Sequence, residues 1–369
     1  MFKTIAIVLI AGLAAVRAQE NPKPAAPVMS VEEYSPRSTL VVPAHPVLRA
    51  KYPVIDVHNH QDGAMKRDKL DQLVRDMDRI NVRVMVNLSG GYGEKLAKGV
   101  ENLKGHYPDR FIVFANIDFT NLDAPDYSKR AAMQLEKDVR TGGAQGLKIF
   151  KNFGMDLKDS KGQRVHVDDP RFDLLFETCG RLRIPVLIHT AEPWSFFQPM
   201  DKHNERWLEL KTHPGRARPP EKYPSWETLM EEQHTLFARH PNTTFIDAHL
   251  GWYGSNLAEL GRLLDRLPNV YTEIGAVLYD LGRQPKFARQ FLIQYQDRVM
   301  FGKDSWNADE YPTYYRVLET GDEYFDYYRK YHAFWQMYGL ELPDEVLKKL
   351  YFQNALRVIP GIDPKVFPQ

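Results

Sequence analysis

The sequence contains a single cysteine, Cys179, among 369 residues. One cysteine excludes an intramolecular disulfide framework and a zinc site built from several thiolates. An excess of charge of one sign is also missing, because the sequence has 49 Lys and Arg residues and 48 Asp and Glu residues, for a formal net charge of +1. No global field therefore attracts nucleic acid or an anionic membrane surface. Any metal ion bound here must be held by histidine and carboxylate side chains.

Two catalytic sequence motifs are absent. No Gly-x-Gly-x-x-Gly follows a predicted strand, which argues against a dinucleotide-binding fold. No Gly-x-Ser-x-Gly occurs, which argues against a serine-nucleophile hydrolase. Beyond the N-terminus, no apolar run is long enough to cross a membrane. We therefore expect a small-molecule substrate, no nucleic-acid partner and no membrane span in the processed protein.

The N-terminus has the pattern of an export signal. A lysine at position 3 precedes an apolar stretch over 5–16, and the small residue Ala18 suits cleavage before Gln19. The alternative is an uncleaved N-terminal anchor. We predict a signal peptide over 1–18 and a periplasmic or secreted protein. Residues 19–50 contain many prolines and no apolar periodicity, so an extended lead-in is expected before one domain over 51–369.

From about residue 51 onward, apolar β-rich runs alternate with helical patterns. Such alternation predicts βα units around a parallel sheet. The fold class predicted is α/β, a closed (β/α)8 TIM barrel, with an open doubly wound sheet as the alternative. The helical patterns lie at 69–81, 131–140, 171–183, 204–211, 227–239 and 253–267. The predicted strands span 54–60, 82–88, 111–118, 145–150, 185–190, 243–250, 270–276 and 299–305.

Some fifty residues, 191–242, separate the fifth predicted strand from the sixth. In a barrel this insertion would lie on the C-terminal face, where active sites form. We expect a long lid insertion that shapes substrate choice. A structural flap, stabilised by its aromatic residues, is the alternative that the sequence leaves open.

Ionisable residues end four of the eight predicted strands. In a strand, residues two apart share one face, so His58 and His60 of the first strand point the same way. The fifth strand ends near His189, the sixth near His249 and the eighth near Asp304. Burial of an unpaired charge is expensive, and the C-terminal ends of barrel strands converge. Together these residues predict a metal site.

These motifs resemble the amidohydrolase superfamily. More narrowly, they resemble its amidohydrolase-related branch, which holds aminocarboxymuconate-semialdehyde and resorcylate-type decarboxylases as well as hydrolases. The resemblance covers roughly residues 51–360. It is carried by Ile55-Asp56-Val57-His58-Asn59-His60, His189-Thr190, Ala248-His249-Leu250-Gly251, Phe301-Gly302-Lys303-Asp304 and Asn354-Ala355-Leu356-Arg357.

The resemblance implies one divalent metal ion, most often zinc and sometimes manganese. By position, His58, His60, His189 and Asp304 would be its ligands, and His249 would be an acid/base next to it. Asp304 would also serve as a base. Such a metal lowers the pKa of bound water towards about 7. Binuclear relatives use a carboxylated lysine where Lys148 stands, so a binuclear site stays open.

Four residues near the strand ends are predicted for the substrate pocket: Lys148, Glu192, Trp252 and Trp306. For Lys148 a salt bridge without a catalytic part is the alternative, and for the tryptophans it is packing at the rim. Glu192, and Glu273 inside the seventh strand, could each meet substrate or pair with an arginine. Lys303 departs from the family pattern, in which a small residue is usual, and could crowd or charge the site.

Three functions remain as hypotheses. The first is a metal-dependent hydrolase of a C–N or C–O bond in a small molecule, such as an amide, lactone or ester. The second is a metal-dependent non-oxidative decarboxylase of an aromatic or unsaturated acid. The third is a non-catalytic secreted binding protein. The sequence names neither the substrate nor the oligomeric state, and it leaves a homo-oligomer open.

Overall fold

The computed structural model describes residues 29–368, in two compact units that divide after Leu40. The predicted signal peptide, 1–18, and the first part of the lead-in lie outside the described residues. Residues 29–40 of the first unit form no helix or strand, apart from a turn in which the backbone N–H of Glu33 donates to Ser30 O. The second unit, from Val41 onward, carries the fold.

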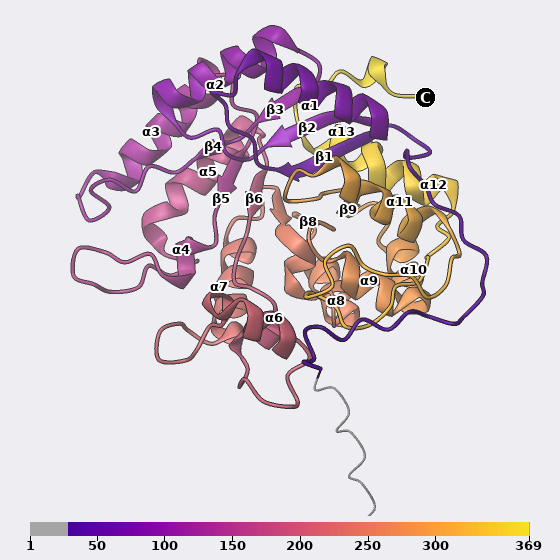
Figure 1. The fold of residues 1–369 in the computed structure, drawn as a ribbon. Helices are drawn as coiled ribbons and strands as arrows, with labels where there is room; N and C mark the ends of the chain where they lie inside the picture. The colour runs from indigo at the N-terminus through magenta and orange to yellow at the C-terminus, as the bar shows by residue number, and fades with distance from the viewer. Residues whose placement is uncertain (1–28, 369) are drawn as a thin grey trace, which may run out of the picture. The chain divides into compact units, whose positions relative to one another are not determined.

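Nine parallel strands make up the sheet of the second unit (Figure 1). Hydrogen bonds order β1, β2 and β3 in one sheet and β4 through β9 in another. The strands are β1 Val54–Asn59, β2 Val82–Asn87, β3 Phe111–Val113, β4 Ala115–Asn116, β5 Leu147–Ile149, β6 Val186–Ile188, β7 Phe245–Asp247, β8 Val270–Glu273 and β9 Val299–Met300.

The two sheets close into one barrel at both of their edges. β3 and β4 are successive pieces of a single strand, interrupted only at Phe114. At the other edge, the Val57 N–H donates to Phe301 O at 3.0 Å, and an isolated parallel bridge joins Asn59 to Asp304. The barrel therefore has eight strands, as the sequence predicts.

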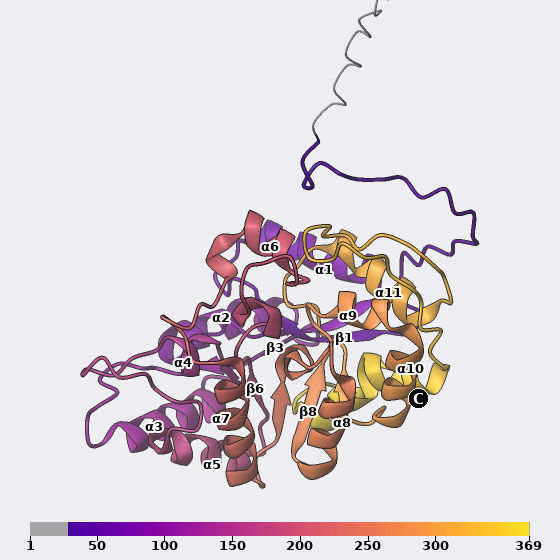
Figure 2. The ribbon, with the colours of Figure 1, turned by 90° about the horizontal axis from the view of Figure 1, so that it is seen from below.

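Helices surround the strands on the outside (Figures 1 and 2). Their inward faces and the strands share one apolar core, as expected for a barrel whose strands are covered on both faces. The helices are α1 Arg67–Ile80, α2 Gly93–His106, α3 Tyr127–Arg140, α4 Asn152–Met155, α5 Asp173–Leu182, α6 Trp207–Thr212, α7 Trp226–Arg239, α8 Leu257–Arg266, α9 Leu278–Arg283, α10 Pro285–Gln294, α11 Tyr311–Glu319, α12 Asp344–Lys348 and α13 Asn354–Val358.

The insertion between β6 and β7 contains α6 and α7, joined by irregular chain. Glu209 of α6 is fully buried and forms ion pairs with Arg206 and Arg216. These contacts give the insertion a polar core of its own. Within residues 29–368, no helix is both long and apolar enough to span a membrane.

Candidate metal centre

The end of β1 brings two imidazoles together. His58 is fully buried and His60 is partly exposed. Their Nε2 atoms lie 3.4 Å and 3.5 Å from the same oxygen, Asp304 Oδ1. The Nδ1 atom of His60 lies 2.8 Å from Ser89 Oγ, at the end of β2. The spacing of two residues thus places both rings at one carboxylate, as the strand geometry predicts.

The ends of β6 and β7 add two further histidines. His249 Nε2 lies 3.2 Å from His189 Nδ1. The Nδ1 of His249 lies 2.7 Å from the carbonyl oxygen of Gly275. The indole of Trp252 packs against His249, with ring centroids 4.6 Å apart. The Nε2 atom of His189 is buried and has no hydrogen-bond partner.

Left-handed backbone conformation is concentrated at these strand ends. His249, Leu250, Gly251 and Trp252 follow one another with φ between 55° and 60°, so they form a left-handed turn. Asp304 has a φ of 78°. A left-handed residue other than glycine costs about 1–2 kcal/mol. Such conformations persist where surrounding contacts enforce them, and they are concentrated at functional sites.

The donor atoms fit a divalent metal ion. One atom each from His58, His249 and Asp304 lies within 4.8 Å of the others. His60 Nε2 lies 3.5 Å from Asp304 Oδ1, close to the 3.4 Å of His58 Nε2. The buried Nε2 of His189 has no hydrogen-bond partner among the described residues. Imidazole nitrogens with one carboxylate are a usual ligand set for zinc and are compatible with manganese. The structure therefore groups two of the predicted ligands, His58 and Asp304, with His249, the predicted acid/base. The other two predicted ligands lie at the edge of this group, His60 beside Asp304 and His189 beside His249.

Burial controls the charges in this site. Burial, and next the Lys148 ammonium, lower the pKa of His58 to about 3, so its ring is neutral at pH 7. Burial also lowers the pKa of His189 well below its ordinary value. The Asp304 side chain is partly exposed, and the hydrogen bond with His60 and the nearby histidines hold the pKa of its carboxyl well below the usual range. Neutral imidazoles and an ionised carboxylate are the forms that bind metal.

Lys148 points at the metal centre. Its Nζ lies 3.5 Å from His58 Nε2, and the side chain is 1 % exposed. Burial lowers the pKa of Lys148 to about 8. The ammonium also lies 5.5 Å from the ring of Phe150, which packs against His60 at 5.7 Å.

The other predicted pocket residues have different surroundings. Glu192 accepts hydrogen bonds from Lys151 and from Arg218, so it is a buried partner of two cations. Trp306 packs against Tyr311, with centroids 5.2 Å apart. No contact joins either of them to the histidines.

Glu273, at the end of β8, is the residue whose role the sequence leaves least defined. Its Oε1 lies 2.9 Å from His58 Nδ1 and accepts the backbone N–H of His249 at 2.7 Å. In the sequence, Glu273 is marked as a candidate site residue by being acidic inside an otherwise apolar strand. Its partners lie 215 and 24 positions away, so the contacts could not be read from the pattern.

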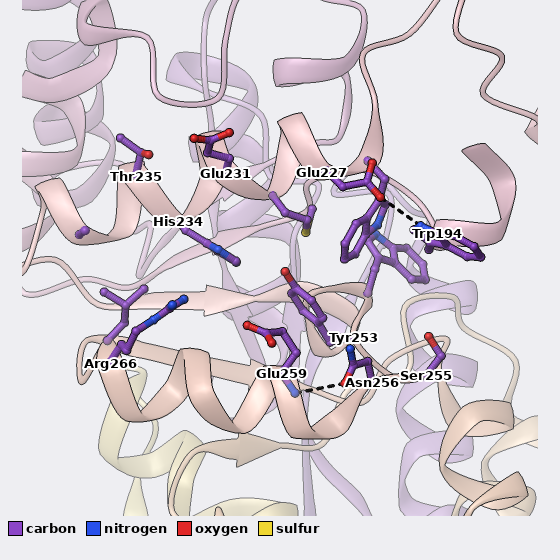
Figure 3. A pocket seen from close by; sticks show the side chains of 15 residues that line it. Trp194, Glu227, Glu231, His234, Thr235, Tyr253, Ser255, Asn256, Glu259 and Arg266 are labelled. Atoms are coloured by element: carbon purple, nitrogen blue, oxygen red, sulfur yellow. Dashed lines mark hydrogen bonds between the residues drawn. The ribbon is translucent and has the colours of Figure 1, made fainter. Parts of the chain in front are cut away.

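A separate cavity of about 830 Å³ lies between α7 and α8 (Figure 3). His234 and Glu231 line it from α7, and Glu259 and Arg266 line it from α8. Of the residues predicted for the site, only Trp252 reaches this cavity. The metal centre and the cavity are therefore neighbours that share one indole.

Comparison with known proteins agrees with this geometry. A model of the family described as Amidohydrolase matches residues 55–361. An uncharacterised TIM-barrel protein from Bordetella bronchiseptica is 17% identical, with a TM-score of 0.51 over 83% of this chain and 98% of that one. A 2,6-dihydroxybenzoate decarboxylase is 16% identical, with a TM-score of 0.50 over 83% and 99%. A 4-oxalomesaconate hydratase from Rhodopseudomonas palustris is 14% identical, with a TM-score of 0.50 over 85% and 97%. The barrel is shared with these structures, and the chain belongs to the amidohydrolase family.

Proposed function

We propose that the protein is a metal-dependent hydrolase that cleaves a C–N or C–O bond of a small molecule. The proposal is carried by two of the proposed ligands, His58 and Asp304, which lie with the proposed acid/base His249 within 4.8 Å of one another, at the C-terminal ends of three barrel strands. Family membership supports an enzyme with a metal and gives no support to a non-catalytic binding protein.

The ligands proposed are His58, His60, His189 and Asp304. A divalent ion held by them would act as a Lewis acid and lower the pKa of a water molecule. Asp304 accepts a proton, because its carboxyl is held ionised by its neighbours. The Nδ1 of His249 donates to Gly275 O, which leaves Nε2 unprotonated, 3.2 Å from His189 Nδ1, as the nitrogen that would take up a proton.

A non-oxidative decarboxylase of an aromatic or unsaturated acid is the second candidate. The observation in its favour is the buried ammonium of Lys148 beside the ring of Phe150, both next to the first-strand histidines. A cation next to an aromatic wall would suit a substrate that has a carboxylate on an unsaturated frame. On this reaction the carboxylate leaves as carbon dioxide and a proton replaces it at carbon.

One set of assays tests both candidates. We expect about one zinc or manganese ion per purified chain, and turnover of an ester, lactone or amide that stops on chelation and returns with metal. His58→Ala and Asp304→Asn should each lower metal-dependent turnover by more than about 100-fold, because they remove ligands themselves rather than the supporting groups whose loss costs about 10- to 100-fold.

Asp309→Asn, at an exposed aspartate near Asp304 in sequence, is the matched control and should retain activity. Release of carbon dioxide from hydroxybenzoates, without hydrolysis of the first panel, would replace the hydrolase by the decarboxylase. Protein with neither bound metal nor metal-dependent turnover on either panel would contradict both.

A further inference from the structure

Glu273 is a carboxylate with three hydrogen-bonding neighbours and no exposure to solvent. Its Oε1 accepts the N–H of His249, and its Oε2 accepts the N–H of Gly275. The third neighbour is the His58 ring, whose Nδ1 lies 2.9 Å from Oε1. An arginine partner or a substrate contact, the two roles considered from the sequence, does not account for this arrangement.

These contacts determine where the proton of His58 lies. Backbone N–H groups can only donate, so both oxygens of Glu273 act as acceptors. The His58 Nδ1 beside them must then donate, and the ring proton lies on Nδ1. The second nitrogen, Nε2, is left without a proton, 3.4 Å from Asp304 Oδ1. That is the form in which an imidazole binds metal.

The same segment determines the proton position of His249. The carbonyl of Gly275 can only accept, so the His249 Nδ1 at 2.7 Å donates to it. The His249 N–H reaches Glu273 from a left-handed residue, with a φ of 60°. Residues 273–275 therefore control both the backbone and the tautomer of His249.

Two glycines make room for the carboxylate. A Cβ at Gly302 would lie 2.1 Å from Glu273 Oε2, and a Cβ at Gly275 would lie 2.6 Å from it. Since real Cβ atoms do not approach this closely, a larger residue at either position would displace the carboxylate. Glu273 can therefore occupy its position only because residue 302 has no side chain.

We propose that Glu273 is a positioning residue: it fixes His58 with Nε2 free for the metal and fixes His249 through its backbone N–H. One carboxylate thereby couples a metal ligand on β1 to the acid/base after β7. The inference rests on the proposed metal function, and it gives a role to Glu273, to which neither the motifs nor the family comparison assigns one. Loss of a supporting group of this kind lowers metal affinity about 10- to 100-fold.

The first experiment uses the wild-type, metal-free protein. Long-range ¹H–¹⁵N spectra of protein labelled with [¹⁵N]histidine report the tautomer of each ring, and His58→Gln assigns the signal. We expect protonated Nδ1 and unprotonated Nε2 for His58 at pH 7.5. The opposite tautomer, or a rapid mixture of the two, would overturn the proposal without any need for a variant at Glu273.

The second experiment compares variants by titration calorimetry of the apoprotein with Zn²⁺ alone. Glu273→Gln lacks the charge and offers an N–H to one of the two backbone donors. Gly275→Ala keeps the carboxylate and displaces it, because a Cβ there would lie 2.6 Å from Glu273 Oε2. Both should bind Zn²⁺ about 10- to 100-fold more weakly and show a mixed His58 tautomer. Asp138→Asn is the matched control, because Asp138 is a buried carboxyl on α3 that accepts hydrogen bonds from the Gly93 N–H and from Gln134, away from both rings.

These outcomes separate the positioning role from the proposed reaction. Wild-type Zn²⁺ affinity and an unchanged His58 spectrum in both folded variants would refute the role of Glu273, whatever the enzyme turns over. The predicted tautomer and affinity changes without turnover on any substrate would support Glu273 and leave the reaction class refuted. Circular dichroism distinguishes a folded variant from an unfolded one, and the wild-type spectrum decides if both variants unfold.

Discussion

Lys303 is a buried charge that its neighbours neutralise. Its ammonium is 1 % exposed and binds Glu310 and the carbonyl of Ser305. Arg329 binds the same carboxylate, and the ring of Tyr328 lies 5.1 Å from the ammonium. The residue that precedes Asp304 therefore turns its charge away from the metal centre. The sequence-based concern that Lys303 would charge the site is not met.

Replacing Lys303 by methionine tests this account at the level of one side chain. Loss of a partner from a buried ion pair leaves an uncompensated charge, and Arg329 compensates part of it, so we expect about 2–4 kcal/mol of lost stability. Lys51→Met is the control, because Lys51 pairs with Asp344 at the surface, where such pairs contribute less than about 1 kcal/mol. Urea unfolding curves give both values. An equal loss of stability in the two variants would show that the Glu310 carboxylate is stable in the folded protein without Lys303.

The individual site residues were predictable to different degrees. His58, His60, His189, His249 and Asp304 stand where apolar strands end, and the sequence alone picks them out because a buried ionisable group needs a reason. The partners of Glu273 come from β1 and from the turn after β7, so only the closed barrel reveals them. For Glu192 the sequence left open a pairing with arginine, and the structure places its carboxylate between Arg218 and Lys151.

Among the elements, the turn at 249–252 differs most from regular structure. Four successive left-handed residues hold His249 at the end of β7. Glu273 accepts the N–H at its start, and the Thr272 hydroxyl holds the carbonyl of Asp247 just before it. The turn is compact because a carboxylate oxygen of Asp247 lies against Gly251.

Gly251→Ala measures how closely this turn is packed. At a φ of 57° alanine costs about 1 kcal/mol in backbone energy, and its Cβ would meet Asp247 Oδ2 at 2.3 Å. We expect a loss of about 2–4 kcal/mol in total, measured by chemical unfolding. Gly162→Ala has a φ of 76° with nothing within 4 Å, so it should cost only about 1 kcal/mol. A similar loss in both variants would mean that the contact with Asp247 relaxes freely.

Strands were easier to predict than the chain that connects them. All eight barrel strands lie in the predicted ranges, but they are shorter. After β6, β7, β8 and β9 the chain soon reaches a left-handed residue, at Ala191, His249, Ala276 and Asp304, and these conformations leave no pattern in the sequence. Helix α2 was not predicted, since only Leu96, Gly99 and Leu103 of its fourteen residues are buried. The start of α8 was placed four residues early, because Asn256 caps the helix there.

In the second unit as a whole, the insertion after β6 is joined to the chain that follows α11. His332 lies between them, with Nε2 3.0 Å from the Arg216 guanidinium and 3.4 Å from Glu209. His213 of the insertion stacks on Tyr331, with centroids 4.6 Å apart. The Arg206 guanidinium lies 4.3 Å from the ring of Tyr279, which follows β8. These contacts hold the insertion to α9 and to the chain that follows α11.

Acid should weaken this junction and with it the stability of the unit. Burial, and next the neighbouring arginines, lower the pKa of His332 to about 2. Below about pH 6.5 the unfolded chain binds a proton at this residue that the folded chain does not, so the free energy of unfolding falls as the pH falls. The loss from His332 should reach about 2 kcal/mol at pH 5 and grow until about pH 2.

His332→Gln removes the side chain that binds this proton in the unfolded state, and it keeps an acceptor for Arg216. Urea unfolding between pH 7.5 and pH 5 should show that the variant loses about 2 kcal/mol less stability over this range than the wild type does. His203→Gln, at an exposed turn of the insertion, controls for the loss of a histidine and should follow the wild type. If His332→Gln kept the wild-type dependence on pH, the ring would have to accept a proton in the folded protein. The arginine beside its Nε2 would then have to turn away, and the insertion would be held by Glu209 and the stacked rings alone.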